Sequence, residues 1–242
     1  MSSGLFDVPF FLSTFPALVR VIPVTLKITA VAMALAVVLG LAVALARIYR
    51  IPVLSQAAAV YVSFARGTPL LVQIYLSYYG IPVLLEWLKA RYGLNLDLNE
   101  LPAIVFIYFA FALNVGAYLS ETIRAAILAI DKGQMEAALS VGMSTWKGMQ
   151  RIVLPQALAV ALPSLGNTVI ALVKDTSLAF MISVVELMGE ARLQGARSLR
   201  FFEVYIAVAL VYWAICIIIE RLVTLLERRV RHFEGTAAAR PA

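Results

Sequence analysis

The chain has 242 residues, of which 62% are hydrophobic and only 14% are charged, and its formal net charge is +6. A water-soluble domain of this length needs more charge on its surface, so these values exclude an ordinary soluble protein and indicate a membrane protein. One cysteine excludes an internal disulfide, and one cysteine with one histidine cannot complete a structural zinc site, so no metal site is expected.

Five apolar stretches are long enough to cross a bilayer, which takes about 20 helical residues. The sequence therefore predicts an all-α fold, a polytopic membrane bundle of about five transmembrane helices in a single domain, residues 1–242. Residues Val8–Val19, rich in Phe and Pro, are expected at the membrane interface, and the tail 234–242 is expected to be disordered. The five stretches are Val24–Ala46, Gln56–Leu85, Leu101–Ile123, Gln156–Val173 and Val204–Val223.

Lys and Arg residues are unevenly distributed over the segments between these stretches. Residues 47–55, 124–155 and the chain after 221 together hold more of them than the opposite set of segments. Because cytoplasmic segments carry the excess of positive charge, this set is assigned to the cytoplasm, with the N-terminus outside and the C-terminus inside. The bias accounts for the net positive charge, and no basic stripe with interleaved aromatic residues indicates nucleic-acid binding.

The long polar loop at about 131–155 is predicted to contain two helices separated by a glycine. Gly133 can open the first helix, and Glu136 near its first turn suits the helix dipole. Gly142 can end that helix, because glycine adopts the left-handed conformation without strain, and Ser144 can cap the second helix. The loop is therefore expected to be a compact knob between the third and fourth membrane stretches.

The sequence of this loop resembles a known signature. It reads EAALSVG from Glu136 to Gly142 and then, after nine intervening residues, IVLP from Ile152. This pattern resembles the EAA loop of bacterial ABC importer permeases, a family in which the short helix docks into a cleft of the cytoplasmic ATPase. The alternative, an ordinary amphipathic connector, does not explain the full spacing in this topological place. The resemblance implies that the ATPase couples to Glu136, Ala137, Ala138 and Gly142.

Two further stretches resemble signatures of the polar amino acid permeases within this family. YVSFARGTPLLVQ from Tyr61 is similar to the signature of the second span, and KDTSL from Lys174 to a motif late in the fourth. The resemblance extends over about Val24 to Phe233, and Phe201–Tyr205 is weakly similar to cystine permeases. It implies a subunit of the bacterial inner membrane that imports a polar amino acid, such as cystine or a charged or amide amino acid, by alternating access.

The same resemblance implies three protein partners: a cytoplasmic ABC ATPase dimer, an extracytoplasmic solute-binding protein and a second permease subunit, identical or related. The chain has no phosphate-binding glycine loop, no histidine-based acid–base pair and no nucleophile elbow. We therefore expect no catalysis and no cofactor in this chain, with ATP bound by the partner. Two other hypotheses remain open, namely an importer of an anion or a sugar, and a passive channel or structural membrane subunit.

Polar residues inside the apolar stretches are the candidates for the substrate pathway. Arg66 lies inside the second stretch, where a charged side chain needs a partner, backbone carbonyls or water. Gly67 and Pro69 allow the helix to break beside it, so Arg66 either contacts substrate or anchors this kink. Thr68 lies in the same signature and is assigned to the pathway with it. Asn114 interrupts the third stretch and either lines the pathway or joins two helices through its amide.

Asp175 is a further candidate, beside Lys174, Thr176 and Ser177 at the end of the fourth stretch. A broken helix here would present a carboxylate and hydroxyls to a cavity, and such groups suit the ammonium of an amino acid. The alternative is an interfacial Lys174–Asp175 pair, since a straight helix from Gln156 would reach the outer membrane surface. The family resemblance places this position in the substrate cavity, so Asp175, Thr176 and Ser177 are predicted to lie in the pathway.

Overall fold

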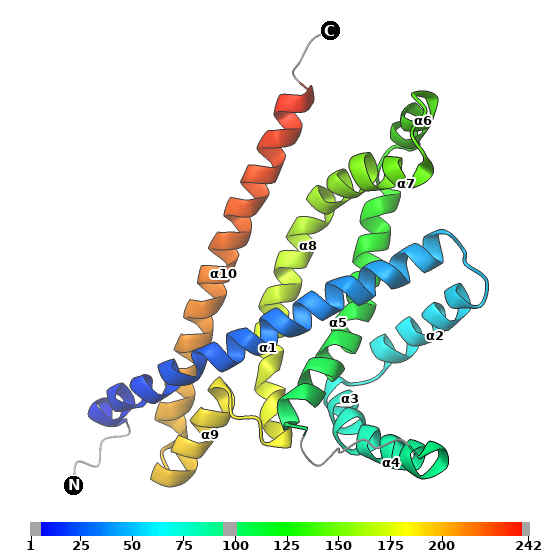
Figure 1. Ribbon diagram of the computed structural model, residues 1–242. Coiled ribbons are helices and arrows are strands. Elements are labelled where there is room, and N and C mark those ends of the chain that lie inside the picture. The colour runs from blue at the N-terminus through cyan, green and yellow to red at the C-terminus, as the bar shows by residue number, and fades with distance from the viewer. Residues whose placement is uncertain (1–5, 94–100, 239–242) are drawn as a thin grey trace.

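The computed structural model describes residues 6–93 and 101–238 of the chain, and Figure 1 shows them as a bundle of helices. These residues form no strand, and five helical segments are long and apolar enough to cross a membrane. The predicted all-α class and polytopic bundle are therefore confirmed. The five segments are Val8–Ile48, Leu70–Tyr92, Ala103–Leu128, Thr145–Ile182 and Phe201–Arg229.

The first helix, α1 (Val8–Ile48), is 41 residues long and begins well before the expected start at Val24. Residues Val8–Val19, expected as a separate interfacial segment, form its first turns. Pro16 and Pro23 lie inside the helix without ending it. Each proline removes one backbone donor, and membrane helices tolerate prolines where neighbouring groups or local changes of helix geometry satisfy the freed carbonyl. Figure 1 shows that α1 crosses the bundle obliquely.

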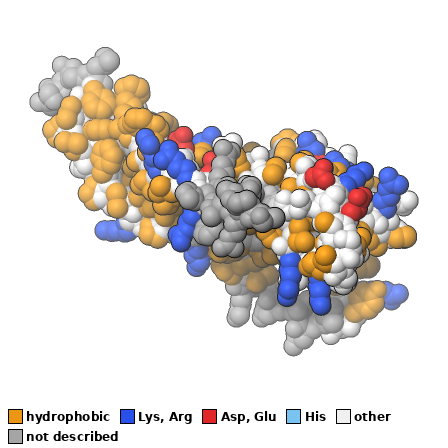
Figure 2. Space-filling model, turned by 90° about the horizontal axis from the view of Figure 1, so that it is seen from above, with side chains coloured by type: hydrophobic (Ala, Val, Ile, Leu, Met, Phe, Trp, Pro, Cys, Tyr) orange, Lys and Arg blue, Asp and Glu red, His pale blue; other side chains and the backbone are white. Residues whose placement is uncertain are grey.

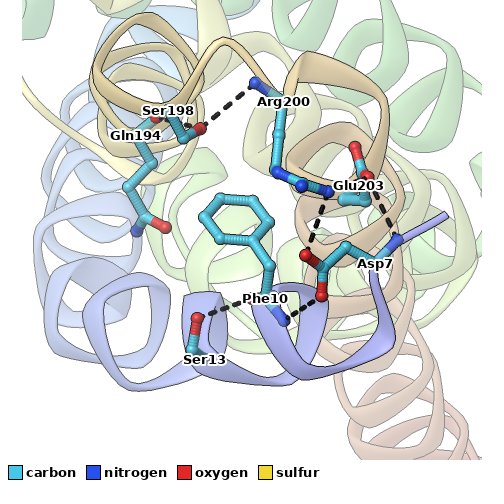
Figure 3. A network of polar contacts seen from close by, with 7 residues as sticks. All are labelled: Asp7, Phe10, Ser13, Gln194, Ser198, Arg200 and Glu203. Atoms are coloured by element: carbon cyan, nitrogen blue, oxygen red, sulfur yellow. Dashed lines mark hydrogen bonds and ion pairs between the residues drawn. The ribbon is translucent and has the colours of Figure 1, made fainter. Parts of the chain in front are cut away.

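The N-terminal end of α1 is fastened to the start of the last helix by a polar network (Figure 3). The Asp7 carboxylate caps α1 by accepting a hydrogen bond from the Phe10 backbone N–H at 3.0 Å. It also pairs with Arg200 at 3.1 Å, and Arg200 pairs with Glu203 at 3.2 Å. The Arg200 guanidinium lies 5.6 Å from the centroid of the Phe10 ring, a cation–π contact. The network therefore joins residues that are far apart in the sequence, since Asp7 and Glu203 are separated by 196 positions.

The opposite end of α1 is fastened to the third membrane helix, α5 (Ala103–Leu128), by a second ion-pair network. Arg47, in the last turn of α1, pairs with Glu121 of α5. Arg124 pairs with the other oxygen of the same carboxylate at 2.9 Å. Both ends of the long first helix are therefore held by charged groups on its neighbours.

The second apolar stretch, Gln56–Leu85, is not one continuous helix, and it breaks where Gly67 and Pro69 were expected to allow a break. The helix stops at Gly67, and Thr68 and Pro69 have extended backbones before a new helix starts. Proline lacks a backbone donor and disfavours helical geometry in the residue before it, so the break falls at this pair. The membrane-crossing part is Leu70–Tyr92. The pieces are α2 (Leu54–Gly67), α3 (Leu70–Tyr75), the π-helical turn η1 (Leu76–Gly80) and α4 (Ile81–Tyr92).

The second half of the chain contains the loop, two further membrane helices and a short helix between them. The last helix continues through Ala238, so residues 234–238 of the expected disordered tail are helical, and residues 239–242 lie outside the described residues. The elements after α5 are α6 (Lys132–Ser140), α7 (Thr145–Gly148), the π-helical turn η2 (Met149–Val153), α8 (Leu154–Asp175), the 3₁₀ segment η3 (Thr176–Ile182), α9 (Leu187–Ser198) and α10 (Phe201–Ala238).

The core of the bundle lies between α1 and α5. Small residues on α1 face large apolar residues on α5, and Ala32 and Phe111 are both completely buried. Where Gly40 meets α5, a Cβ on it would stand 3.0 Å from the Leu119 Cβ and 3.1 Å from the Gly116 carbonyl oxygen. Such close backbone approach is how membrane helices gain packing contacts without a hydrophobic driving force from water.

Candidate functional site

The loop between α5 and α8 has the predicted arrangement of two short helices separated by a glycine. One detail of the prediction is wrong. The first helix begins at Lys132, and the Asp131 carboxylate caps it by accepting a hydrogen bond from the Gly133 N–H at 2.7 Å. Gly133 is therefore inside the helix, and Glu136 lies beyond its first turn, where the helix dipole has little effect on a charge.

Gly142 is the residue that ends α6. Its φ of +80° lies in the left-handed region, which favours glycine. The Met143 N–H donates to the Ala138 carbonyl and the Gly142 N–H to the Leu139 carbonyl, each at 3.0 Å. These two bonds form a Schellman motif, which satisfies the last carbonyls of the helix. Ser144 then caps α7, as predicted.

The surface of α6 is divided between exposed and packed residues. Glu136 and Ala137 are exposed, whereas Ala138 is only 1% exposed. Ala138 packs on Gly148 of α7: a Cβ added there would lie 3.3 Å from the Ala138 Cβ and 2.8 Å from the Met135 sulfur. This close contact means that α6 cannot shift without moving α7 and the turn that leads into α8.

The break between α2 and α3 leaves backbone carbonyls without helical partners, and Gln73 binds them. Its side-chain nitrogen donates to the Ala65 carbonyl at 2.8 Å, the Thr68 carbonyl at 3.1 Å and the Thr68 hydroxyl at 2.8 Å. The Asn114 nitrogen donates to the Gln73 side-chain oxygen at 3.2 Å and the Ala65 carbonyl at 3.3 Å. Buried carbonyls need such partners because lipid offers none.

A cavity of about 560 Å³ lies beside this break and contains three of the predicted pathway residues. Thr68 comes from the break itself, Asn114 from α5 and Asp175 from the end of α8. Asn114 therefore joins two segments through its amide, which was one of its two interpretations, and it also lines the cavity. The other polar residues in the lining are Tyr118, Asn167 and Thr168.

The other three predicted pathway residues do not line this cavity. Arg66 is exposed, with its guanidinium 5.4 Å from the ring centroid of Tyr118, which does line the cavity, so Arg66 lies at the rim. Thr176 is completely buried and donates to the Val173 carbonyl at 2.7 Å. Ser177 is half-buried outside the lining. In a 3₁₀ helix successive residues are about 120° apart, so neighbours of Asp175 point in other directions.

Three polar residues of the site, Gln73, Asn167 and Thr168, were not singled out from the sequence. Asn167 and Thr168 precede Asp175 by two helical turns, and this spacing could have placed them on the same face of α8. Gln73 lies within the second-span signature, but its role depends on carbonyls that only the broken helix exposes.

We expect Gln73→Leu to lower both the thermal stability of the protein in detergent and its transport activity. The substitution removes every hydrogen bond of the Gln73 amide, including those to the Thr68 carbonyl and the Asn114 nitrogen. A buried polar group left without a partner costs about 1–3 kcal/mol. Ser77→Ala is the matched control, because Ser77 is also buried but donates to the Gln73 carbonyl within its own helix, away from the break. Equal melting temperatures and uptake rates for the two variants would contradict the role assigned to Gln73.

Comparison with known proteins extends over nearly the whole chain. Residues 36–232 match the family described as "Binding-protein-dependent transport system inner membrane component". The chain is 41% identical to the probable amino-acid permease protein YxeN of Bacillus subtilis (strain 168), with 92% of this chain and 95% of the relative covered. It is 40% identical to the L-cystine transport system permease protein TcyL of the same organism, with 93% and 92% covered.

Solved structures show the same fold. A chain from a crystal structure of an amino acid ABC transporter with histidines superposes with a TM-score of 0.77 at 34% identity, covering 93% of this chain and 100% of that one. A chain of the MetNI methionine ABC transporter superposes with a TM-score of 0.69 at 19% identity, covering 93% and 99%, and supports the fold alone. The chain therefore belongs to the family of binding-protein-dependent transport system inner membrane components, as a multi-pass inner-membrane permease subunit of the amino-acid ABC importers.

Proposed function

We propose that this subunit carries a polar amino acid through the cavity beside Asp175. The observation that carries the proposal is the meeting of Thr68, Asn114 and Asp175, from three separate segments, in one cavity next to a broken membrane helix. A carboxylate among hydroxyl and amide groups suits the ammonium and polar groups of an amino acid. Arg66 at the rim supplies the opposite charge for a carboxylate.

The proposed mechanism is alternating access, and α8 connects its two working parts. The helix follows directly from the loop that contains α6 and α7, and its last residue, Asp175, lines the cavity. Its 22 residues span about 33 Å at 1.5 Å per residue. A force applied to the exposed surface of α6 at Glu136 would tilt α8 and move the Asp175 side of the cavity relative to α5.

The force in this proposal comes from a cytoplasmic ATPase dimer that binds and hydrolyses ATP, so the chain itself is not catalytic and holds no cofactor. Glu136 and Ala137 form the exposed docking surface, while Ala138 and Gly142 fix its shape. An extracytoplasmic solute-binding protein delivers the substrate, and a second permease subunit, identical or related, completes the pathway.

Uptake by the reconstituted complex tests this function. The relatives are named for L-cystine, nopaline and octopine, which makes cystine the first substrate to assay, followed by charged and amide amino acids. We expect uptake into proteoliposomes that depends on both ATP and the binding protein. Uptake of a sugar or an inorganic anion instead would support the alternative importer, and flux without ATP would support a channel.

The proposed orientation places the coupling loop and the C-terminus in the cytoplasm and the N-terminus outside. Figure 2 shows the molecule from above, from the end that carries α6 and α7. Residues 124–155, which include both helices, hold four Lys and Arg residues and two Asp and Glu residues. This distribution agrees with the excess of positive charge on cytoplasmic segments.

We expect cysteine labelling to report this orientation. In a Cys216→Ser background, a membrane-impermeant maleimide should label Ala90→Cys in intact cells with a permeabilised outer envelope. It should label Ser140→Cys only after the inner membrane is opened. Both positions are exposed, at the end of α4 and the end of α6. The reverse labelling pattern would invert the topology.

A further inference from the structure

Glu186 is a completely buried carboxyl group that begins α9. It accepts a hydrogen bond from the Gly189 N–H at 2.9 Å and another from the Tyr212 hydroxyl of α10 at 2.7 Å. None of the ion pairs among the described side chains includes it. Burial raises the pKa of the Glu186 carboxyl, against the lowering effect of these hydrogen bonds. Neutral donors alone therefore hold this group.

The same carboxyl touches η3, the 3₁₀ segment that starts directly after Asp175. The Thr176 hydroxyl oxygen lies 3.5 Å from a Glu186 carboxyl oxygen, and both residues are completely buried. Thr176 is the next residue after Asp175 in the chain. The position of Thr176 therefore determines the position of the Asp175 backbone, and with it the direction in which the Asp175 side chain enters the cavity. The contact thus lies immediately behind the cavity wall.

Helix α9 also packs on the middle of η3, around Phe180. A Cβ added to Gly189 would lie 2.8 Å from the Phe180 ring, so the helix backbone lies directly against it. The Arg192 guanidinium lies 5.7 Å from the centroid of the same ring. These contacts and the Glu186–Thr176 contact hold η3 at two points along its length.

The start of α9 is in turn fixed to α1. The Leu187 N–H donates to the Thr25 hydroxyl at 3.3 Å, and both residues are completely buried. We propose that Glu186 is a positioning residue that ties η3 to α9, α10 and α1 and thereby holds Asp175 in the wall of the cavity. Its importance for transport rests on the proposed function, but its effect on the geometry of η3 does not.

Thiol labelling inside the cavity tests the positioning role without any substrate. Leu178 belongs to η3 and lines the cavity, so Leu178→Cys in a Cys216→Ser background reports the state of the wall. In the purified protein, Glu186→Leu is expected to change the maleimide labelling rate at this cysteine by about threefold or more, a factor at the lower end of the range for residues joined by one hydrogen-bond network. Tyr212→Phe should shift it in the same direction. Glu186→Gln should stay near the parent rate, because its oxygen can accept from the Gly189 N–H and its NH2 group can donate to the Tyr212 hydroxyl, which can also accept.

A control cysteine at Ser140 should label at the parent rate in every variant, which excludes general unfolding. Labelling at Leu178→Cys that is unchanged in Tyr212→Phe and Glu186→Leu would overturn the proposal, whatever the substrate is. If the Glu186→Leu protein does not accumulate in cells, the labelling rate of Tyr212→Phe alone tests the proposal. This variant removes a single hydroxyl group and is expected to fold.

The KM measured in the uptake assay distinguishes an effect of Glu186 that acts through Asp175 from a general structural effect. If Glu186 acts through Asp175, Glu186→Leu should raise KM for the amino acid in the parent protein and change it by less than about twofold in an Asp175→Asn background. Equal factors in both backgrounds would overturn the connection to Asp175. Absence of amino acid uptake in the parent, with the labelling effect intact, would count against the proposed function and leave the positioning role standing.

Discussion

Gly142→Val is expected to abolish ATP-driven uptake while the protein still inserts into the membrane. Gly142 has a φ of +80° with no atom within 4 Å of a Cβ placed on it, so the effect would come from the backbone alone. The left-handed conformation costs an ordinary residue about 1–2 kcal/mol, and a β-branched residue more. The Schellman motif would open, α6 would lose its fixed end, and uptake by the reconstituted complex should fall at least about tenfold.

The chain offers a matched control at Gly93. This residue ends α4 with a φ of +67°, and it too has no atom within 4 Å of an added Cβ. Gly93→Val therefore imposes the same backbone strain outside the coupling loop, and it should leave coupling to the ATPase intact. Glu136→Arg provides an independent test, because Glu136 is exposed on the proposed docking surface and lies beyond the first turn of α6. Normal substrate-stimulated ATPase activity in both loop variants would contradict the coupling role.

Asp175→Ala is expected to weaken substrate affinity at the transport site by about 10- to 100-fold, with insertion and ATPase docking intact. The carboxylate lines the cavity, and a hydrogen bond to a charged group contributes about 1.5–3 kcal/mol. Asp175→Asn separates charge from shape. If the charge binds the ammonium, Asn should behave nearly like Ala, and affinity can be measured from the concentration dependence of uptake.

Lys174 is the control for this prediction, since it is exposed, precedes Asp175 and does not line the cavity. Lys174→Ala alone should leave affinity unchanged. The double variant Lys174→Ala/Asp175→Ala excludes an unpaired lysine as the cause of any defect. Uptake at the parent level in both the single Asp175 variant and the double variant would show that the pair is an interfacial anchor.

The sequence allowed the coupling loop to be predicted because its signals are local. A glycine between two helix-forming segments has few structural alternatives, and Gly142 has the predicted role. The cap was assigned to Gly133 instead of Asp131, because a side-chain cap depends on where the chain enters the helix. The predicted start of the first helix was also wrong. Hydropathy and the prolines indicated a start at Val24, whereas the helix begins at Val8, where Asp7 pairs with Arg200 next to α10.

The site could be predicted only in part. A polar residue within an apolar stretch can be found from the sequence, but the sequence does not show which way its side chain points. Asp175 and Asn114 were recognised as buried polar groups, and the structure places both at the cavity. Thr176 follows Asp175 directly but faces Glu186, since the helix tightens to a 3₁₀ form at that point. Glu186 itself lies in a segment of mixed composition, where a carboxylate looks like an ordinary surface charge until burial is known.

The length of α1 has a consequence for the lipid in which this permease works. Its 41 residues extend for about 61 Å, roughly twice the thickness of a hydrocarbon core of about 30 Å. A helix longer than the bilayer adapts by tilting. Because Asp7 and Arg47 bind its two ends to α10 and α5, any change of tilt is passed to both neighbours. Hydrophobic mismatch, set by acyl-chain length, is therefore expected to act on α5, which lines the cavity through Asn114 and Tyr118.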